Sequence, residues 1–176
     1  GFIKDTKLSF LKKYNVQKLN LIFNYKDKHL LLNNIEFSLN SLKFLSEKVS
    51  LKKIKNDFFV EGKVNHKKID LKEKNLSLFV KPLLPEYDIK TLKFSSSNSF
   101  SFKINDKLKI NNFDIHSEIL LDKLSVNNNF DLKKFFPNYK EEILFLDHKL
   151  SINYKKDIFD INGNGDILLQ EKKDSL

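Results

Sequence analysis

Apolar and polar residues alternate with a period of two along most of the chain, and the pattern is longest between Ile143 and Gln170. Period two is the signature of a strand with one apolar face. A polar break at residues 155–157 divides the stretch, which therefore predicts a long antiparallel hairpin. The side of the hairpin that carries most of the apolar residues is formed by Leu144, Leu146, His148, Leu150, Ile152 and Tyr154, then Phe159, Ile161, Gly163, Gly165, Ile167 and Leu169.

Shorter runs of the same kind fill the rest of the chain. Residues 2–18 fit either a short helix or an edge strand. The segment 81–87 contains Pro82 and Pro85, which cannot donate to a strand ladder, and it predicts a loop. The chain is interpreted as one β-rich segment, 1–176, with a possible subdivision at this loop. Polar clusters predict turns at 26–28, 33–34, 55–57, 65–68, 73–75, 95–99, 105–107 and 111–112.

One place departs from the period of two. Leu132, Phe135 and Phe136 are spaced as on a helix, and Pro137 would end it. The expected fold is mainly all-β: a long antiparallel meander that forms a curved sheet or groove, with one short helix near 131–136. A closed sandwich remains the alternative, because alternation alone does not distinguish the two.

The composition narrows the function classes. There is no Cys, which excludes disulfides and thiolate metal sites. The net charge is +9 and every basic side chain among the 32 is Lys. Arg, the usual residue for base edges and bidentate phosphate contacts, is absent, so nucleic acid is not an expected partner. Attraction to anionic lipid headgroups stays open. Because strands run close to both ends and no leader precedes them, we expect a segment of a longer protein.

The candidates for chemistry are few. The four histidines are scattered without metal-ligand spacing, so no metal, cofactor or catalytic residue is expected and the chain is not expected to be an enzyme. His148 lies among apolar positions and predicts a partly buried, satisfied histidine. Gly163 and Gly165 lie inside a strand pattern, where glycine marks a bulge, a bend or a close approach of backbone.

Four stretches resemble the AsmA-like family of bacterial envelope proteins, which includes TamB-like and YhdP-like members. They are Leu132–Pro137, Ile143–Leu150, Phe159–Gly165 and Ile167–Gln170. The resemblance implies a long sheet bent into a hydrophobic groove, anchored in the inner membrane through a segment not present here and extending into the periplasm. It implies a role in phospholipid transport or outer-membrane assembly, with phospholipid or another acyl lipid and the two membranes as partners.

Under this hypothesis fourteen residues would line a lipid groove. They are Leu76, Leu78, Val80, Phe100, Phe102, Ile104, Leu144, Leu146, Leu150, Ile152, Phe159, Ile161, Ile167 and Leu169. Two other classes remain as alternatives: a structural or adhesive β repeat without lipid binding, and a basic nucleic-acid-binding β domain.

Overall fold

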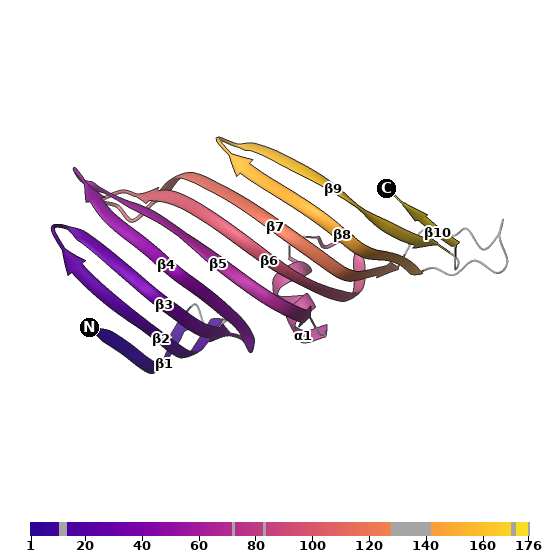
Figure 1. Cartoon of the computed structure of the whole chain (residues 1–176), viewed down its shortest axis with the longest axis horizontal. Coiled ribbons are helices and arrows are strands. Elements are labelled where there is room, and N and C mark those ends of the chain that lie inside the picture. The colour runs from indigo at the N-terminus through magenta and orange to yellow at the C-terminus, as the bar shows by residue number, and fades with distance from the viewer. Residues whose placement is uncertain (11–13, 72, 83, 128–141, 170–171, 176) are drawn as a thin grey trace. The chain divides into compact units, whose positions relative to one another are not determined.

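The computed structural model describes residues 1–10, 14–71, 73–82, 84–127, 142–169 and 172–175. Strands dominate, and they form a single antiparallel sheet that is not closed (Figure 1). The strand order follows the chain from β1 to β10, so each strand pairs with its neighbours in sequence. The predicted antiparallel meander is therefore confirmed, and the closed sandwich is excluded. The predicted helix at 131–136 lies outside the described residues.

The strands are long. Their bounds are β1 Phe2–Phe10, β2 Tyr14–Lys26, β3 His29–Leu39, β4 Leu42–Ile54, β5 Asp57–Leu71, β6 Asp88–Ile104, β7 Ile110–Asn127, β8 Glu142–Lys155, β9 Ile158–Leu169 and β10 Lys172–Ser175. β8 and β9 form the hairpin expected from 143–170. The sequence left a short helix and an edge strand open for residues 2–18, and the described residues of this segment belong to β1 and β2.

Contacts divide the chain into two compact units. Unit 1 contains 1–66, 96–118 and 151–161, and unit 2 contains 67–95, 119–150 and 162–176. Several strands contribute to both units. The Pro-containing loop 81–87, where a subdivision was expected, lies within unit 2.

The segment Leu76–Val80 was expected to be a strand, and this prediction is wrong. Residues Glu73–Asn75 form the short helix α1, and Leu76–Val80 form the π-helical turn η1. The amide of Lys81 donates to the carbonyl oxygen of Leu76 at 2.9 Å, a bond that closes one π turn. Over only five residues, apolar side chains at every second position also fit helical spacing, because the first and the last of them, Leu76 and Val80, are four residues apart. Because Leu76 is buried while Pro82 cannot extend a ladder, the helical turn is favoured.

Four expected turns are interior parts of long strands. Residues 33–34 lie in β3, 65–68 in β5, 95–99 in β6 and 111–112 in β7. Asn34, Lys68 and Asn112 have positive φ values of 50°, 46° and 52°, so these positions kink the strand and do not reverse it. The serine-rich segment stays extended, and the Asn98 amide donates to the Val64 carbonyl at 3.0 Å and to Ser96 Oγ at 2.9 Å.

These left-handed residues change which positions share a face. In each case the residue that follows the left-handed one is apolar or aromatic. Its side chain lies on the same face as the side chain three residues before it. Phe145 and His148 illustrate this step: their rings lie 5.7 Å apart, and Asp147 between them has φ 53°. Similarly, burial in β5 moves from even positions such as Val60 to the odd positions Ile69 and Leu71 after Lys68. At Lys68 the step keeps the buried apolar side chains of β5 on one face.

A substitution at Lys68 tests this step. Left-handed backbone costs a residue with a Cβ about 1 kcal/mol or more, and β-branching makes the conformation worse. We expect Lys68→Val to lower the free energy of unfolding by about 1–2 kcal/mol in urea titrations. The neighbouring Lys67, which is exposed and has no positive φ, provides the control. Lys67→Val should leave stability within about 0.5 kcal/mol; equal losses for both variants would show that the φ of Lys68 is not under constraint.

Candidate functional site

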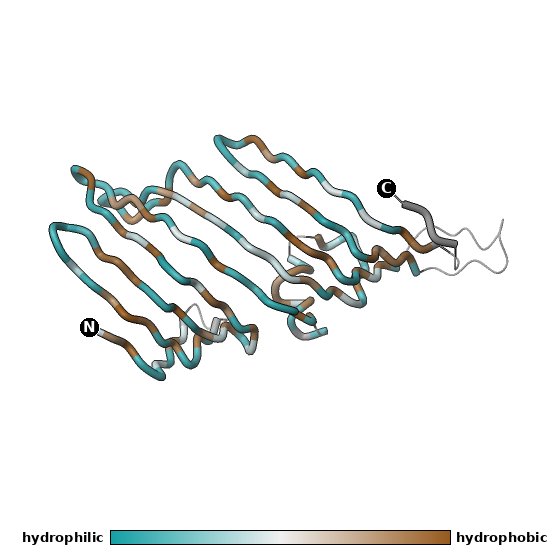
Figure 2. The backbone as a smooth tube through the Cα atoms, viewed as in Figure 1, coloured by the Kyte–Doolittle hydropathy of each residue, from teal (hydrophilic) through white to brown (hydrophobic). Residues whose placement is uncertain are grey.

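The strongest candidate site is an apolar face on unit 1, which we call the phenylalanine face. The cross-strand pairs Leu32–Val49 and Val49–Gly62 place their members on this face, and a Cβ on Gly62 would lie 2.9 Å from the Phe100 ring. Figure 2 shows the alternation of hydropathy along the strands that produces it. The face consists of Leu32, Ile35, Phe37, Phe44, Val49, Val60, Gly62, His66, Phe100, Phe102, Phe113 and Tyr154.

Aromatic contacts connect neighbouring strands across this face. Phe37 of β3 stacks on its cross-strand partner Phe44 of β4, with centroids 4.9 Å apart. The edge of His66 meets Phe44 at 4.3 Å. A second series runs from Phe102 of β6 to Phe113 of β7 at 6.2 Å, and from Phe113 to Tyr154 of β8 at 6.1 Å. Such pairs contribute about 0.5–1.5 kcal/mol each beyond the area that they bury.

Most side chains of this face are partly covered, and only Ile35 and Val60 are buried. Among the described residues, only six hydrophobic side chains of the chain fall in the buried class: Ile35, Val60, Ile69, Leu71, Leu76 and Leu121. Phe113 remains 40% exposed. Because the described residues form one sheet and no second sheet, the apolar side chains are covered by their neighbours on the same face and not by an opposing layer.

Not all of the fourteen residues expected to line a groove share one face. Phe100, Phe102 and Ile104 lie at alternate positions of β6 and share a face. Ile152 is two residues before Tyr154 on β8 and therefore lies on the same face as Tyr154. Phe159 and Ile161 of β9 are exposed, at 59% and 55%. These six belong to the phenylalanine face or continue its alternation. Leu76, Leu78 and Val80 lie in η1 and not in a strand.

On unit 2, the prediction that one face carries both Leu144 and His148 is wrong. The left-handed Asp147 shifts the alternation, so Phe145 and His148 share a face, and Leu144 and Leu146 lie on the other. Leu150 lies on the same face of β8 as His148. Ile167 follows Gly165 at a spacing of two on β9, a strand without positive φ. Leu169 is the last residue of β9.

The expectations for His148 and the two glycines are confirmed. His148 is 7% exposed, and its Nδ1 lies 3.0 Å from the Leu146 carbonyl oxygen. A Cβ on Gly165 would collide with the His148 ring, and one on Gly163 would collide with Leu150. Glycine is therefore needed at both positions because a bulky side chain on β8 lies directly across from each. The alternation missed Phe37, Phe44, Phe113, Tyr154 and Phe145 as site residues, although the first four lie within the strand patterns.

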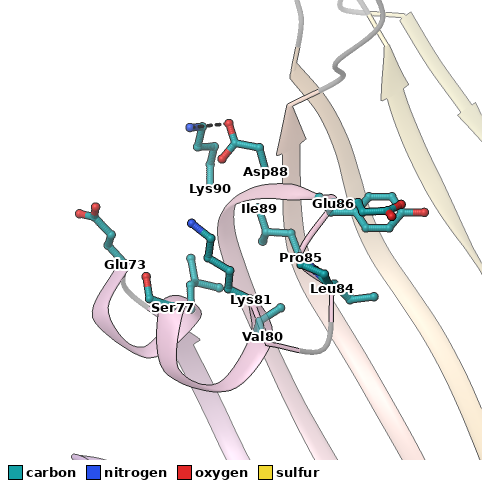
Figure 3. Close-up of a pocket in the computed structure, with 12 residues that line it drawn as sticks. Glu73, Ser77, Val80, Lys81, Leu84, Pro85, Glu86, Asp88, Ile89 and Lys90 are labelled. Carbon is teal, nitrogen blue, oxygen red and sulfur yellow. Dashed lines mark ion pairs between the residues drawn. The ribbon is translucent and has the colours of Figure 1, made fainter.

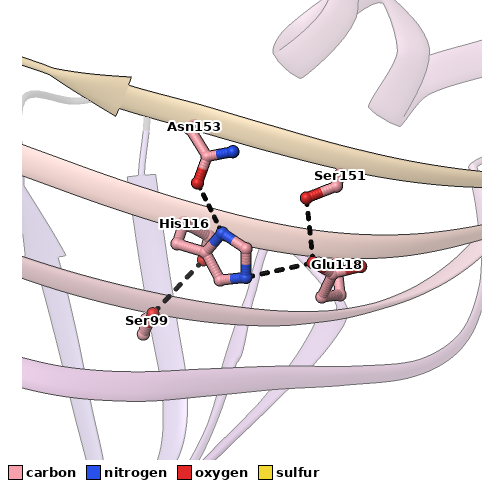
Figure 4. Close-up of polar contacts among 5 residues, drawn as sticks. All are labelled: Ser99, His116, Glu118, Ser151 and Asn153. Carbon is pink, nitrogen blue, oxygen red and sulfur yellow. Dashed lines mark hydrogen bonds and ion pairs between the residues drawn. The ribbon is translucent and has the colours of Figure 1, made fainter. Parts of the chain in front are cut away.

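The opposite side of unit 1, which we call the polar face, carries a groove of about 870 Å³. Its polar lining includes Ser50, Ser99, Ser101, Asp114, His116 and Asn153. The His116 ring nitrogens lie 2.6 Å from Asn153 Oδ1 and 3.0 Å from Glu118 Oε1, and Ser151 Oγ donates to the same Glu118 oxygen at 2.9 Å (Figure 4).

These polar contacts do not form a nucleophile and base pair. The Ser151 hydroxyl donates to a carboxylate and not to the imidazole, and Ser99 donates to the His116 carbonyl oxygen at 3.5 Å. The His116 and Glu118 side chains are 48% and 59% exposed, and ion pairs so exposed contribute little. No group of three or more potential metal ligands occurs among the described residues.

A smaller cavity of about 600 Å³ lies beside η1 in unit 2 (Figure 3). Val80, Leu84 and Ile89 supply apolar lining, while Asp88 and Lys90 form an ion pair at 2.8 Å. The hydrogen bond from Lys90 lowers the pKa of the Asp88 carboxyl below its usual value. Acidic and basic side chains are mixed around this cavity, so its charge selects no class of ligand.

Comparisons with protein families, with curated proteins and with solved structures found no match. Within the described residues, no helix has the length and apolar character needed to cross a membrane.

His66 gives the phenylalanine face a pH dependence. Burial lowers the pKa of His66 below its usual value, and the contact of Nδ1 with the Lys43 carbonyl oxygen at 3.4 Å opposes this shift more weakly. The neutral ring is therefore favoured in the folded state. Its contribution to stability is present above the ordinary histidine pKa, near 6.5, and is lost as the pH falls through the lower folded value.

We expect wild-type protein to lose stability between pH 7.5 and pH 5.0, and His66→Gln to reduce this loss because residue 66 then takes up no proton. Urea titrations at the two pH values measure the effect. The exposed His116 provides the control variant, His116→Gln, which should keep the wild-type loss. A His66→Gln protein that loses as much stability as wild type would contradict the role of His66.

Proposed function

We propose that this chain is a non-enzymatic lipid-binding segment whose phenylalanine face holds the acyl chains of phospholipid. The observation that supports this most directly is the incomplete burial of an apolar face in a sheet that is not closed. Exposed apolar patches of a few hundred Å² or more are uncommon on soluble proteins unless they contact a ligand, a membrane or a partner. An acyl chain needs only continuous apolar surface, which a single sheet face supplies without catalytic groups.

The energetics favour a lipid with two chains over a single fatty acid. Burial contributes about 0.8 kcal/mol per methylene, so a chain of about a dozen methylenes that is half covered on an open face gains about 5 kcal/mol. That corresponds to binding weaker than about 100 μM, whereas two chains together, at about 10 kcal/mol, reach about 0.1 μM. The +9 charge, carried by lysine alone, complements an anionic phosphate headgroup in solvent at the edge of the face.

The cellular setting that we propose rests on the resemblance of four sequence stretches to AsmA-like envelope proteins. We propose that the chain is part of such a protein in the periplasm, anchored in the inner membrane through the rest of the parent chain. It would take part in phospholipid transport or outer-membrane assembly between the two membranes.

A charge placed on the phenylalanine face tests the proposal. Phe113→Asp should remove most of the phospholipid that co-purifies with the protein from a bacterial periplasm, because an aspartate exposed among aromatic rings disfavours an acyl chain. Native mass spectrometry with lipid extraction measures the retained lipid. Circular dichroism verifies that the variant is folded, which we expect because Phe113 is 40% exposed.

Leu120 provides a matched control on the same strand. It is 45% exposed and lies an odd number of residues from Phe113, so its side chain is on the opposite face of β7. Leu120→Asp should retain the wild-type amount of phospholipid. Equal lipid content in the two variants, or a wild-type protein that purifies without lipid, would contradict the proposal and favour a structural β repeat.

A further inference from the structure

The hairpin ends on one side of unit 1 share an unusual composition. In a meander, every second turn lies at the same end of the sheet, and the turns β2–β3, β4–β5, β6–β7 and β8–β9 follow one another along the upper-left edge of the sheet in Figure 1. All four belong to unit 1. We call this surface the lysine hairpin end and define it by residues 26–29, 54–57, 105–110 and 155–158, together with Tyr25.

Large apolar side chains are exposed at this end. Leu108 is 81% exposed, which is the highest value among the large hydrophobic residues described, and it is accompanied by others on neighbouring hairpins. These are Tyr25 at 67%, Ile158 at 63%, Ile110 at 60% and Ile54 at 48%. Isolated exposed apolar residues need no explanation, but each of the four adjacent hairpins contributes at least one, so they form a group.

The same four turns are basic. They contain seven lysines and four aspartates, a net charge of +3. The lysines are Lys26, Lys28, Lys55, Lys107, Lys109, Lys155 and Lys156. Apolar tips separated by lysines match the boundary of a bilayer. There, ammonium groups meet anionic headgroups, apolar side chains enter the outer acyl region, and tyrosine has an apolar ring with a polar end.

Leu108 is also held in an unfavourable conformation. Its φ is 58°, a region that favours glycine or asparagine over a residue with a long side chain. The Asn105 side chain fixes the loop, because its Oδ1 accepts hydrogen bonds from the amides of Lys107 at 3.0 Å and Lys109 at 2.9 Å. The Leu108 amide donates to the Asn105 carbonyl oxygen at 3.0 Å. Strain and exposure thus coincide at a residue presented outward by a tight loop, a combination found at binding sites.

We propose that the lysine hairpin end docks on the surface of a membrane rich in anionic phospholipid. This inference does not depend on acyl chains binding to the phenylalanine face, since it concerns different residues and a different lipid surface. The hairpin ends contribute charge and apolar tips, whereas the face contributes aromatic side chains in the middle of the strands.

The experiment measures flotation of purified protein with vesicles of phosphatidylglycerol and phosphatidylcholine. Wild-type protein should bind the mixed vesicles, and binding should fall with added salt and with removal of phosphatidylglycerol. Leu108→Asn combined with Ile158→Asn should weaken binding at least tenfold. Leu108→Asn should at the same time raise the melting temperature, because asparagine tolerates left-handed backbone. A gain in stability together with a loss of binding distinguishes a docking residue from a structural one.

Two controls make the result specific. Leu120→Asn removes another exposed leucine, at 45%, away from the hairpin ends and should bind as wild type. Lys107→Glu with Lys156→Glu should weaken binding at least tenfold, whereas Lys67→Glu with Lys149→Glu makes the same change of net charge elsewhere and should have a clearly smaller effect. Absence of binding by wild type, or equal losses for the hairpin variants and their controls, would overturn the proposal. Phe113→Asp should retain vesicle binding. A failure of the acyl-binding proposal can therefore be distinguished from a failure of the membrane-docking proposal.

Discussion

Residues in left-handed conformation keep the apolar side chains of long strands on one face, and the rest of the structure depends on this constraint. β6 and β7 have 17 and 18 residues. In strands this long, regular alternation of side chains puts all apolar residues on one face only if they stay at every second position of the sequence. Where the phase changes, as between Val60 and Ile69 in β5, a residue with positive φ, Lys68, restores it. Without that step the apolar residues at one end of a strand would lie on the polar face.

The consequence is an apolar face without an opposing layer. Aromatic residues on neighbouring strands contact one another, as Phe37 contacts Phe44 and Phe102 contacts Phe113. These contacts reduce the exposure of the rings but do not bury them fully. A closed sandwich would cover these rings with a second sheet, and the described strands form only one. The proposed lipid binding and the proposed membrane docking both follow from the surface that remains uncovered, the first on the phenylalanine face and the second at the hairpin ends.

The alternation of residues was sufficient to predict the meander and the hairpin of β8 and β9, because residues 143–170 contain one polar break and many strand-forming residues. It failed at Leu76–Val80, where five residues are too few to distinguish strand from helical spacing. It also failed at Phe145, because whether Asp147 adopts positive φ depends on pairing with the neighbouring strand and not on local sequence. Clusters such as 33–34 and 65–68 have the composition of turns, yet in the sheet they are positions where a strand kinks and continues.

The central claim is that the phenylalanine face contacts acyl chains while the polar face does not. Two adjacent residues of β6 test it most directly, since Phe102 lies on the first face and Ser101 on the second. A photoreactive phenylalanine analogue at each position, activated in cells whose phospholipids carry a label, measures contact with lipid at a single side chain. The account predicts lipid crosslinks from position 102 and few from position 101. Equal crosslinking at both positions, or none at position 102, would contradict it.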